Sequence, residues 1–411
     1  MTRFLYDVAL FTLVIFFFPK LLIDFLFKKK YRKSLKLRLK PKAPGGGDKE
    51  VIWLHAVSMG ETKALSTLVP HIRKSHPDAF IFVTTVTETG QEQAKRSIPD
   101  ADAIHFLPLD FSWIIKAFVQ TLRPNLLILV EGDYWLNLMT EVKKCGGHIV
   151  VVNGKLSEKS LKRYLAFRPL ARTLFSSVDH FCLQGESYLE RFLKLGIPPE
   201  KLTITGNLKF DIPLAEPDGL DTFRKSLKLK TSDRVITLGS THDGEESLLL
   251  TALLPFLTED IHLKVLVVPR HPERFKKVKE SFHHPQVTIV DKMGVLPACY
   301  RLSYLAIVGG SFVKGIGGHD IFEPAKMGIP TLFGPYMYKQ MDLDRLLTEA
   351  GGGMKVKPSE LTQAIEKLLC DSKLHLEMSE KGKYAAQKTL GVSFRTWNLI
   401  NSNISLEKKS Q

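Results

Sequence analysis

A short polar segment with a carboxylate follows an apolar stretch near residue 55. It reads HAVSMGE (55–61) and places Ser58, Gly60 and Glu61 where a strand would give way to a helix. Ser58 and Glu61 have the spacing of a capping box, and spacing alone favours that structural role. The alternative interpretation makes Glu61 a general base at the end of a buried strand.

A second acidic segment, EGDYW (131–135), follows another apolar stretch. Glu131 and Asp133, with Trp135 beside them, could bind sugar hydroxyls or shift the pKa of a neighbouring group. Asp133 could equally be a helix cap, and the segment by itself does not separate these two roles.

Cationic and small polar residues follow strands in the second half of the chain. Arg270 comes directly after the apolar run 264–269, where its planar fork of donors suits a phosphate. The turn LGSTHDGEE (238–246) leads into a helix, whose free amides favour an anion, and GNLKFD (206–211) supplies Lys209. These features predict a phosphate-containing ligand.

The most specific segment is VGGSFVKGIGGHDIFEPAKMGIP (308–330). Its glycines let the backbone approach a ligand closely, and the helix after them carries Glu323, a carboxylate placed to accept bonds from ribose hydroxyls. No acidic pair follows a strand in the way that a bound cation requires, so the sequence predicts catalysis without a metal or other cofactor.

Apolar runs of the kind buried in parallel sheets must position these residues. One series covers 51–56, 80–85, 103–107, 125–130 and 148–153, and a second covers 235–240, 264–269, 286–290, 304–310 and 329–334. The stretches between them are long enough for crossover helices. We therefore expect an α/β protein with two Rossmann-like domains that face a cleft, and ligands at the carboxyl ends of the strands.

The domain limits follow from composition. Residues 1–42 form an apolar segment and a basic flank, 43–212 the first domain and 223–405 the second, with a Pro/Gly-rich acidic hinge at 211–222. Four widely spaced cysteines without CxxC spacing argue against a disulfide framework or a structural zinc site.

The first 42 residues indicate a membrane partner. Residues 8–27 are apolar except for Pro19, Lys20 and Asp24, and could span a bilayer or lie in its interface. Nine basic and no acidic residues follow in 28–42, a large part of the net charge of +15. We therefore expect attachment to anionic lipid on the cytoplasmic face of a membrane, and no nucleic acid as partner.

The ordered set of motifs resembles the Kdo transferases, glycosyltransferases that use CMP-Kdo, the cytidine-activated form of 3-deoxy-D-manno-octulosonic acid. The motifs are HAVSMGET, the ExDxW segment, TGNLKFD, STHxGEE, VPRHPERF and VGGS…GGH…EPA, and they extend over nearly the whole chain. The resemblance implies a GT-B fold, the bacterial inner membrane, and transfer of Kdo to a 6′-hydroxyl of a lipid A precursor in lipopolysaccharide synthesis.

The resemblance also assigns roles to residues. It implies that Glu61 is the general base and Glu131 a second essential acidic residue. It implies that the donor is held by Lys209, Ser240, Thr241, Arg270, Gly310, Ser311, His319 and Glu323. Ser58, Gly60, Trp135 and Lys155 are candidates on the acceptor side.

Four positions depart from the family pattern: Asp133 for Glu, Leu136 for Pro, Lys155 for Arg, and Asp320 for Asn. They bear on acceptor geometry and on the number of sugars added.

Two other functions remain open on the residues alone. One is a membrane-associated GT-B transferase that uses a UDP-sugar or CDP-polyol, and the other is a non-catalytic nucleotide-binding membrane protein.

Overall fold

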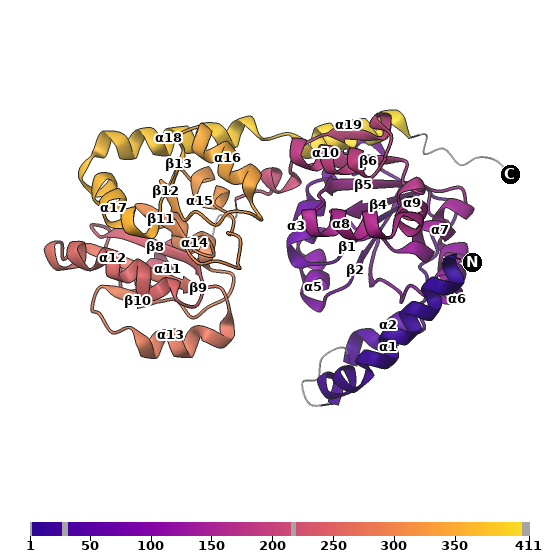
Figure 1. Cartoon of the computed structure of the whole chain (residues 1–411), viewed down its shortest axis with the longest axis horizontal. Coiled ribbons are helices and arrows are strands. Elements are labelled where there is room, and N and C mark those ends of the chain that lie inside the picture. Colours follow the sequence, from indigo (N-terminus) through magenta and orange to yellow (C-terminus); the bar gives the residue numbers. More distant parts are fainter. Residues whose placement is uncertain (1, 27–31, 215–218, 405–411) are drawn as a thin grey trace. The chain divides into compact units, whose positions relative to one another are not determined.

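In the computed structural model, the chain is described except for residues 1, 27–31, 215–218 and 405–411 (Figure 1). It forms two compact units. The first comprises Met1–Ile212 together with the chain from Gly391 onward, and the second comprises Pro213–Leu390.

The described residues of the first unit contain a seven-stranded parallel sheet in the order β3-β2-β1-β4-β5-β6-β7. Its strands are β1 (Val51–Ala56), β2 (Phe80–Thr85), β3 (Ala103–Phe106), β4 (Leu126–Val130), β5 (His148–Gly154), β6 (His180–Leu183) and β7 (Leu202–Ile204). Its helices are α1 (Thr2–Leu26), α2 (Arg32–Leu39), α3 (Met59–Ser66), α4 (Val69–Ser75), α5 (Glu88–Ser97), α6 (Ser112–Leu122), α7 (Leu136–Lys144), α8 (Glu158–Ala166), α9 (Arg168–Ser176), α10 (Glu186–Lys194) and α19 (Val392–Asn403), with short 3-10 turns η1 (Pro199–Lys201) and η2 (Leu208–Asp211).

The first sheet is covered on both faces, which explains its continuous apolar strands. Successive side chains of a strand point to opposite faces. In β1, Val51 and Trp53 therefore belong to one hydrophobic core cluster, whereas Ile52 and Leu54 belong to another. A sheet buried on both sides needs apolar residues at every strand position, and β1 is buried throughout.

The second unit repeats this plan. Its described residues contain a six-stranded parallel sheet in the order β10-β9-β8-β11-β12-β13. The strands are β8 (Arg234–Thr241), β9 (Leu263–Pro269), β10 (Val287–Ile289), β11 (Leu305–Val308), β12 (Thr331–Phe333) and β13 (Gly353–Lys355). The helices are α11 (Leu220–Ser226), α12 (Glu245–Glu259), α13 (Phe275–Ser281), α14 (Leu296–Arg301), α15 (Phe322–Lys326), α16 (Met341–Glu349), α17 (Leu361–Cys370) and α18 (Ser372–Lys388), with 3-10 turns η3 (Pro272–Arg274) and η4 (Pro358–Glu360).

The ten predicted strands are all present, so the α/β class with two Rossmann-like parallel sheets is confirmed. The prediction missed β6, β7 and β13. These strands are only three or four residues long, and their sequences, HFCL, LTI and GMK, show no extended apolar run.

The last helix belongs to the first unit, which differs from the predicted second domain of 223–405. In Figure 1 the yellow α19 lies with the elements of the first unit. Trp397 and Ile400 are buried in one of the cores of the first sheet. The carboxylate of Asp211 accepts bonds from the amides of Gly391 and Ser393, at 2.8 and 2.6 Å, where the chain returns.

The amino-terminal segment is joined to the first unit by polar contacts. Arg3 forms an ion pair of 2.6 Å with Glu141 on α7, and the hydroxyl of Tyr6 donates to Asp110 at 2.9 Å. In α2, the guanidinium of Arg38 donates to the carbonyl of Val86. The predicted anchor and flank, 1–42, are therefore partly docked on the folded unit.

Helix α1 contains Pro19 and carries many exposed apolar side chains, among them Phe11 and Phe16 at 57% and 75% exposure. Within the described residues, no helix combines the length and the apolar character needed to cross a bilayer.

Candidate active site

The segment between β4 and α7 carries a buried carboxylate, Glu131. Its backbone adopts a left-handed conformation, with φ of 67°, and its side chain is 8% exposed. Lys155 forms an ion pair with it from beyond β5, and Lys209 forms another at 3.1 Å from η2. Burial raises the pKa of Glu131, but the two ammonium groups outweigh burial, so the pKa is lower than usual. Glu131 is therefore an ionised, fixed negative charge.

Asn153, at the end of β5, positions one of these lysines. Its side-chain oxygen accepts a bond of 2.9 Å from the amide of Leu208, next to Lys209 in η2. Its side-chain nitrogen lies 3.5 Å from the Glu131 carboxylate. Lys209, expected to hold the donor, thus lies in the first unit against Glu131.

Asp133 is a second carboxylate of the same segment. Its pKa is raised to about 6, mainly because the carboxyl is buried and also because Glu61 and Glu131 place negative charges near it. Its side chain makes no hydrogen bond or ion pair among the described residues. The structure therefore brings together three carboxylates, Glu61, Glu131 and Asp133, which the sequence places in two distant segments.

Ser58 is the N-cap of α3, as its spacing from Glu61 predicted, and its hydroxyl accepts from the Glu61 amide at 3.4 Å. The reciprocal bond of a capping box, from the Ser58 amide to the Glu61 side chain, is replaced by a bond from the preceding amide. The carboxylate of Glu61 accepts 2.7 Å bonds from this amide of Val57 and from the hydroxyl of Ser58. Glu61 is half-buried, and Gly60 beside it is exposed. A carboxylate can accept about four hydrogen bonds, so the capping contacts leave it further acceptor capacity.

Trp135 is held by a buried histidine at the end of β1. The indole nitrogen of Trp135 donates to Nε2 of His55 at 3.2 Å, and Nδ1 of His55 lies 2.9 Å from the Thr84 hydroxyl. Burial lowers the pKa of His55 to about 3, so this imidazole is neutral. His55, which the sequence analysis did not assign, therefore positions Trp135.

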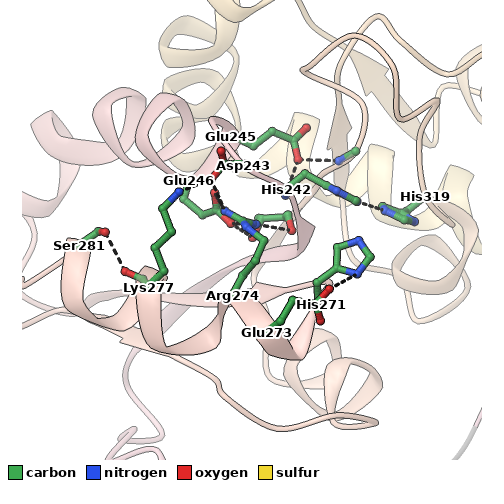
Figure 2. A network of polar contacts seen from close by, with 12 residues as sticks. His242, Asp243, Glu245, Glu246, His271, Glu273, Arg274, Lys277, Ser281 and His319 are labelled. Atoms are coloured by element: carbon green, nitrogen blue, oxygen red, sulfur yellow. Dashed lines mark hydrogen bonds and ion pairs between the residues drawn. The ribbon is translucent and has the colours of Figure 1, made fainter. Parts of the chain in front are cut away.

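In the second unit, a buried carboxylate joins the loops after β8 and β11. Glu245 accepts bonds from the amides of His242, Gly310 and Phe312, at 2.9, 2.7 and 2.9 Å. Figure 2 shows Glu245 beside His242. A Cβ atom on Gly309 would lie 2.7 Å from this carboxylate, so only glycine fits there. Glu245 was not among the predicted site residues, although GEE at the start of a helix was visible.

Two histidines meet at the same loops. Nε2 of His242 lies 2.7 Å from Nε2 of His319, and their rings stack with centroids 5.0 Å apart (Figure 2). Burial, followed by the neighbouring cationic groups, lowers the pKa of His319 to about 4. In a bond between two neutral imidazoles one nitrogen donates and the other accepts. Gly310, with φ of 68°, leaves room for His319, because a Cβ atom there would lie 2.6 Å from the ring.

The two arginines of VVPRHPERF have different surroundings. Arg274 is bonded by both terminal nitrogens to Glu246, at 2.8 and 3.0 Å, and contacts Asp243 at 3.1 Å (Figure 2). The guanidinium of Arg270 is exposed and has no ion pair within the described residues. Of the two, Arg270 is therefore the one available to an anionic ligand.

Other predicted donor residues have internal bonds. The hydroxyl of Thr241 donates to Glu246 at 2.9 Å. The buried hydroxyl of Ser311 donates to Val308 O at 2.6 Å and accepts from the Gly334 amide at 2.8 Å. The hydroxyls of Thr241 and Ser311 therefore stabilise the conformation of the loops. Ser240 is buried with φ of 55°, and Glu323 lies half-buried in the first turn of α15. No cluster of metal-ligating side chains occurs among the residues that the structure describes.

Comparisons with known proteins show which family the chain belongs to. Residues 30–212 match the profile of the 3-deoxy-D-manno-octulosonic-acid transferase (kdotransferase) family. A 3-deoxy-D-manno-octulosonic acid transferase of Chlamydia pneumoniae is 36% identical, over 98% of this chain and 97% of the relative. The enzyme of the same name from Haemophilus influenzae is 32% identical over 85% of this chain and 86% of the relative.

A solved glycosyltransferase from Rickettsia africae has a similar fold, with a TM-score of 0.64 at 14% identity, over 89% of this chain and 100% of that one. The fold is thus GT-B-like. Because the sequence similarity to the curated relatives extends over nearly the full length of the chain, the protein belongs to the 3-deoxy-D-manno-octulosonic acid transferase family.

Proposed function

We propose that the protein transfers one or more Kdo residues from CMP-Kdo to a lipid A precursor, lipid IVA, in lipopolysaccharide synthesis. The near full-length similarity to the Chlamydia pneumoniae transferase carries this proposal. The sites fit this function. In the second unit, Arg270 has no ion pair among the described residues and lies close enough to His319 of the glycine-rich loop to affect its pKa. The first unit offers three grouped carboxylates.

In the proposed reaction, the acceptor hydroxyl attacks the anomeric carbon of Kdo, with inversion, and CMP leaves with the electrons of the broken bond. An alcohol is too weak an acid to ionise first, so the proton must pass to a base as the new bond forms. We assign Glu61 as this base. Arg270 would neutralise charge on the departing CMP. No cofactor beyond the donor is needed.

The direct test is incubation of the full-length protein with CMP-Kdo and a tetraacyl lipid A precursor, followed by mass spectrometry. We expect products heavier than the acceptor by whole Kdo residues, and the mass ladder would report how many are added. UDP-sugars and CDP-polyols should give no product. Transfer from one of these donors, and not from CMP-Kdo, would contradict the proposal.

The base assignment needs variants that separate catalysis from helix capping. Glu61→Gln should reduce transfer by about 10²–10⁴-fold, the usual contribution of a general base. Ser58→Ala removes the N-cap at a stability loss of about 1 kcal/mol but keeps the carboxylate, so it should reduce transfer far less than Glu61→Gln does. If Glu61→Gln transferred Kdo normally while Asp133→Asn did not, the base would be Asp133.

We further propose that the apolar surface of α1 lies in the interface of the bacterial inner membrane, on the cytoplasmic face, beside anionic lipid. The exposed phenylalanines of α1 and the basic sequence after it support this. Deletion of 1–42 would also remove Arg3 and Arg38, which contact the folded unit.

A sharper test is therefore the double change Phe11→Ser and Phe16→Ser. It should weaken binding to vesicles that contain phosphatidylglycerol, because about 0.8 kcal/mol is lost for each CH₂ group no longer buried. Ile261→Ser, at a residue 74% exposed in the second unit, is the matched control. Equal vesicle binding by both variants would contradict the proposal.

A further inference from the structure

A cationic cavity lies between α8, α9 and α10 of the first unit. Its volume is about 920 Å³, and Arg168, Arg172 and Lys194 line it together with Tyr164. Arg168 and Arg172 are one helical turn apart on α9, so they lie on the same face of that helix. Lys194 reaches the cavity from the last turn of α10.

The charges of this cavity are not neutralised by the protein. Among the described residues, Arg168, Arg172 and Lys194 form no ion pair, and no carboxylate lines the cavity. By contrast, Arg191 on α10 is paired with Glu158 at 2.8 Å. Three like charges around one concave space repel one another, and an anion placed among them removes that repulsion.

The cavity adjoins the segment that carries the candidate catalytic carboxylates. Tyr164, in the cavity wall, makes an edge contact with Tyr134, at 6.4 Å between ring centroids. Both rings contact Phe175 at 5.0 Å. Tyr134 directly follows Asp133 in the chain. A ligand that fills the cavity therefore lies against an aromatic wall shared with the acidic segment.

We propose that this cavity binds a phosphate group of the phosphorylated glycolipid acceptor. Guanidinium forks match the oxygens of a phosphate, and a phosphomonoester carries close to two negative charges. The cavity is also much larger than a single phosphate, so it has room for the sugar that bears it. The inference rests on the proposed function for the identity of the acceptor.

The test uses full-length protein, CMP-Kdo and a bisphosphorylated tetraacyl lipid A precursor, compared with the same acceptor after phosphatase treatment. The variants are Arg168→Gln, Arg172→Gln and the double change. Lys162→Gln is the matched control, because it removes one positive charge from the exposed face of α8 outside the cavity lining.

Each single change should raise the KM for the phosphorylated acceptor about fivefold, the factor expected for one solvent-exposed ion pair. The kcat and the KM for CMP-Kdo should stay within about twofold, because neither variant touches the donor or the carboxylates. On the dephosphorylated acceptor, wild type and variants should be alike. The same KM for all proteins, or an equal rise in Lys162→Gln, would overturn the proposal.

Two further arms separate other outcomes. Vesicles of phosphatidylcholine with and without phosphatidic acid report on bulk lipid. If the variants lost only vesicle binding, with acceptor KM unchanged, the cavity would hold membrane phospholipid and the proposal would be wrong. If wild type transferred no Kdo at all, the proposed function would fail. Calorimetric binding of the two acceptors would then still test the cavity, and equal affinities would overturn it.

Discussion

The change Glu245→Gln tests whether one buried carboxylate joins the two loops of the second unit. Glu245 is fully buried, and its two oxygens accept three backbone amides, two on Oε2 and one on Oε1. Glutamine has nearly the same shape but a single acceptor oxygen. Whichever way it is oriented, its NH₂ group faces at least one buried amide donor.

The magnitude follows from the groups left without partners. At least one backbone amide and the new NH₂ group stay buried and unsatisfied, at about 1–3 kcal/mol each. Burial raises the pKa of Glu245, and the amide bonds offset this only in part. Burying the charged carboxylate therefore costs some free energy, and the neutral glutamine side chain avoids that cost. A net destabilisation of about 3 kcal/mol is expected, which for a unit of this size lowers Tm by about 6–12 °C.

Thermal unfolding and calorimetric titration with CMP would measure both consequences. The loop that contains Gly309 and Gly310 would lose its anchor, so affinity for CMP should fall about tenfold or more. Glu273→Gln is the matched control, since that side chain is 75% exposed on a neighbouring turn and should change stability by less than about 0.5 kcal/mol. Wild-type Tm and wild-type CMP affinity in Glu245→Gln would refute the reasoning.

Two further predictions concern the acidic segment of the first unit. The pKa of Glu131 is lower in the folded protein than the value of 4.5 in the unfolded chain. Its charge therefore stabilises the fold at pH values above 4.5, and this stabilisation is lost as the pH falls through the pKa of the folded state. Glu131→Gln should therefore lose about 1–3 kcal/mol at pH 7 and progressively less below pH 4, and a difference that does not change with pH would contradict this. The effect of Asp133 on stability has the opposite pH dependence, because its pKa is raised from 3.8 to about 6. Its ionisation therefore destabilises the fold as the pH rises from about 4 to about 6. Asp133→Asn should raise the unfolding free energy by about 1–3 kcal/mol at pH 8 and leave it unchanged at pH 3, which urea unfolding at both pH values would check.

Part of the active site could be predicted because the fold class implies it. Side chains that follow parallel strands gather at one edge of the sheet, and Glu61, Glu131 and Asp133 follow β1 and β4, which are neighbours in the order of the sheet. The N-cap formed by Ser58 is local, so its spacing from Glu61 was enough to predict it. Arg270 was expected to face a phosphate, but the neutralisation of Arg274 by Glu246 depends on a contact between η3 and α12 that no local pattern shows.

The sequence by itself determined the two parallel sheets, since a strand buried on both faces must be apolar at consecutive positions, as in 51–56 and 80–85. Only the tertiary structure decided which polar residues beyond the strand ends contact one another. Lys155 and Lys209 meet Glu131 because β5 and η2 bring them there, and α19 returns to the first unit because Trp397 packs in its core. Such contacts join residues far apart in the chain, and they form only once packing has fixed the backbone, so periodicity and spacing carry no record of them.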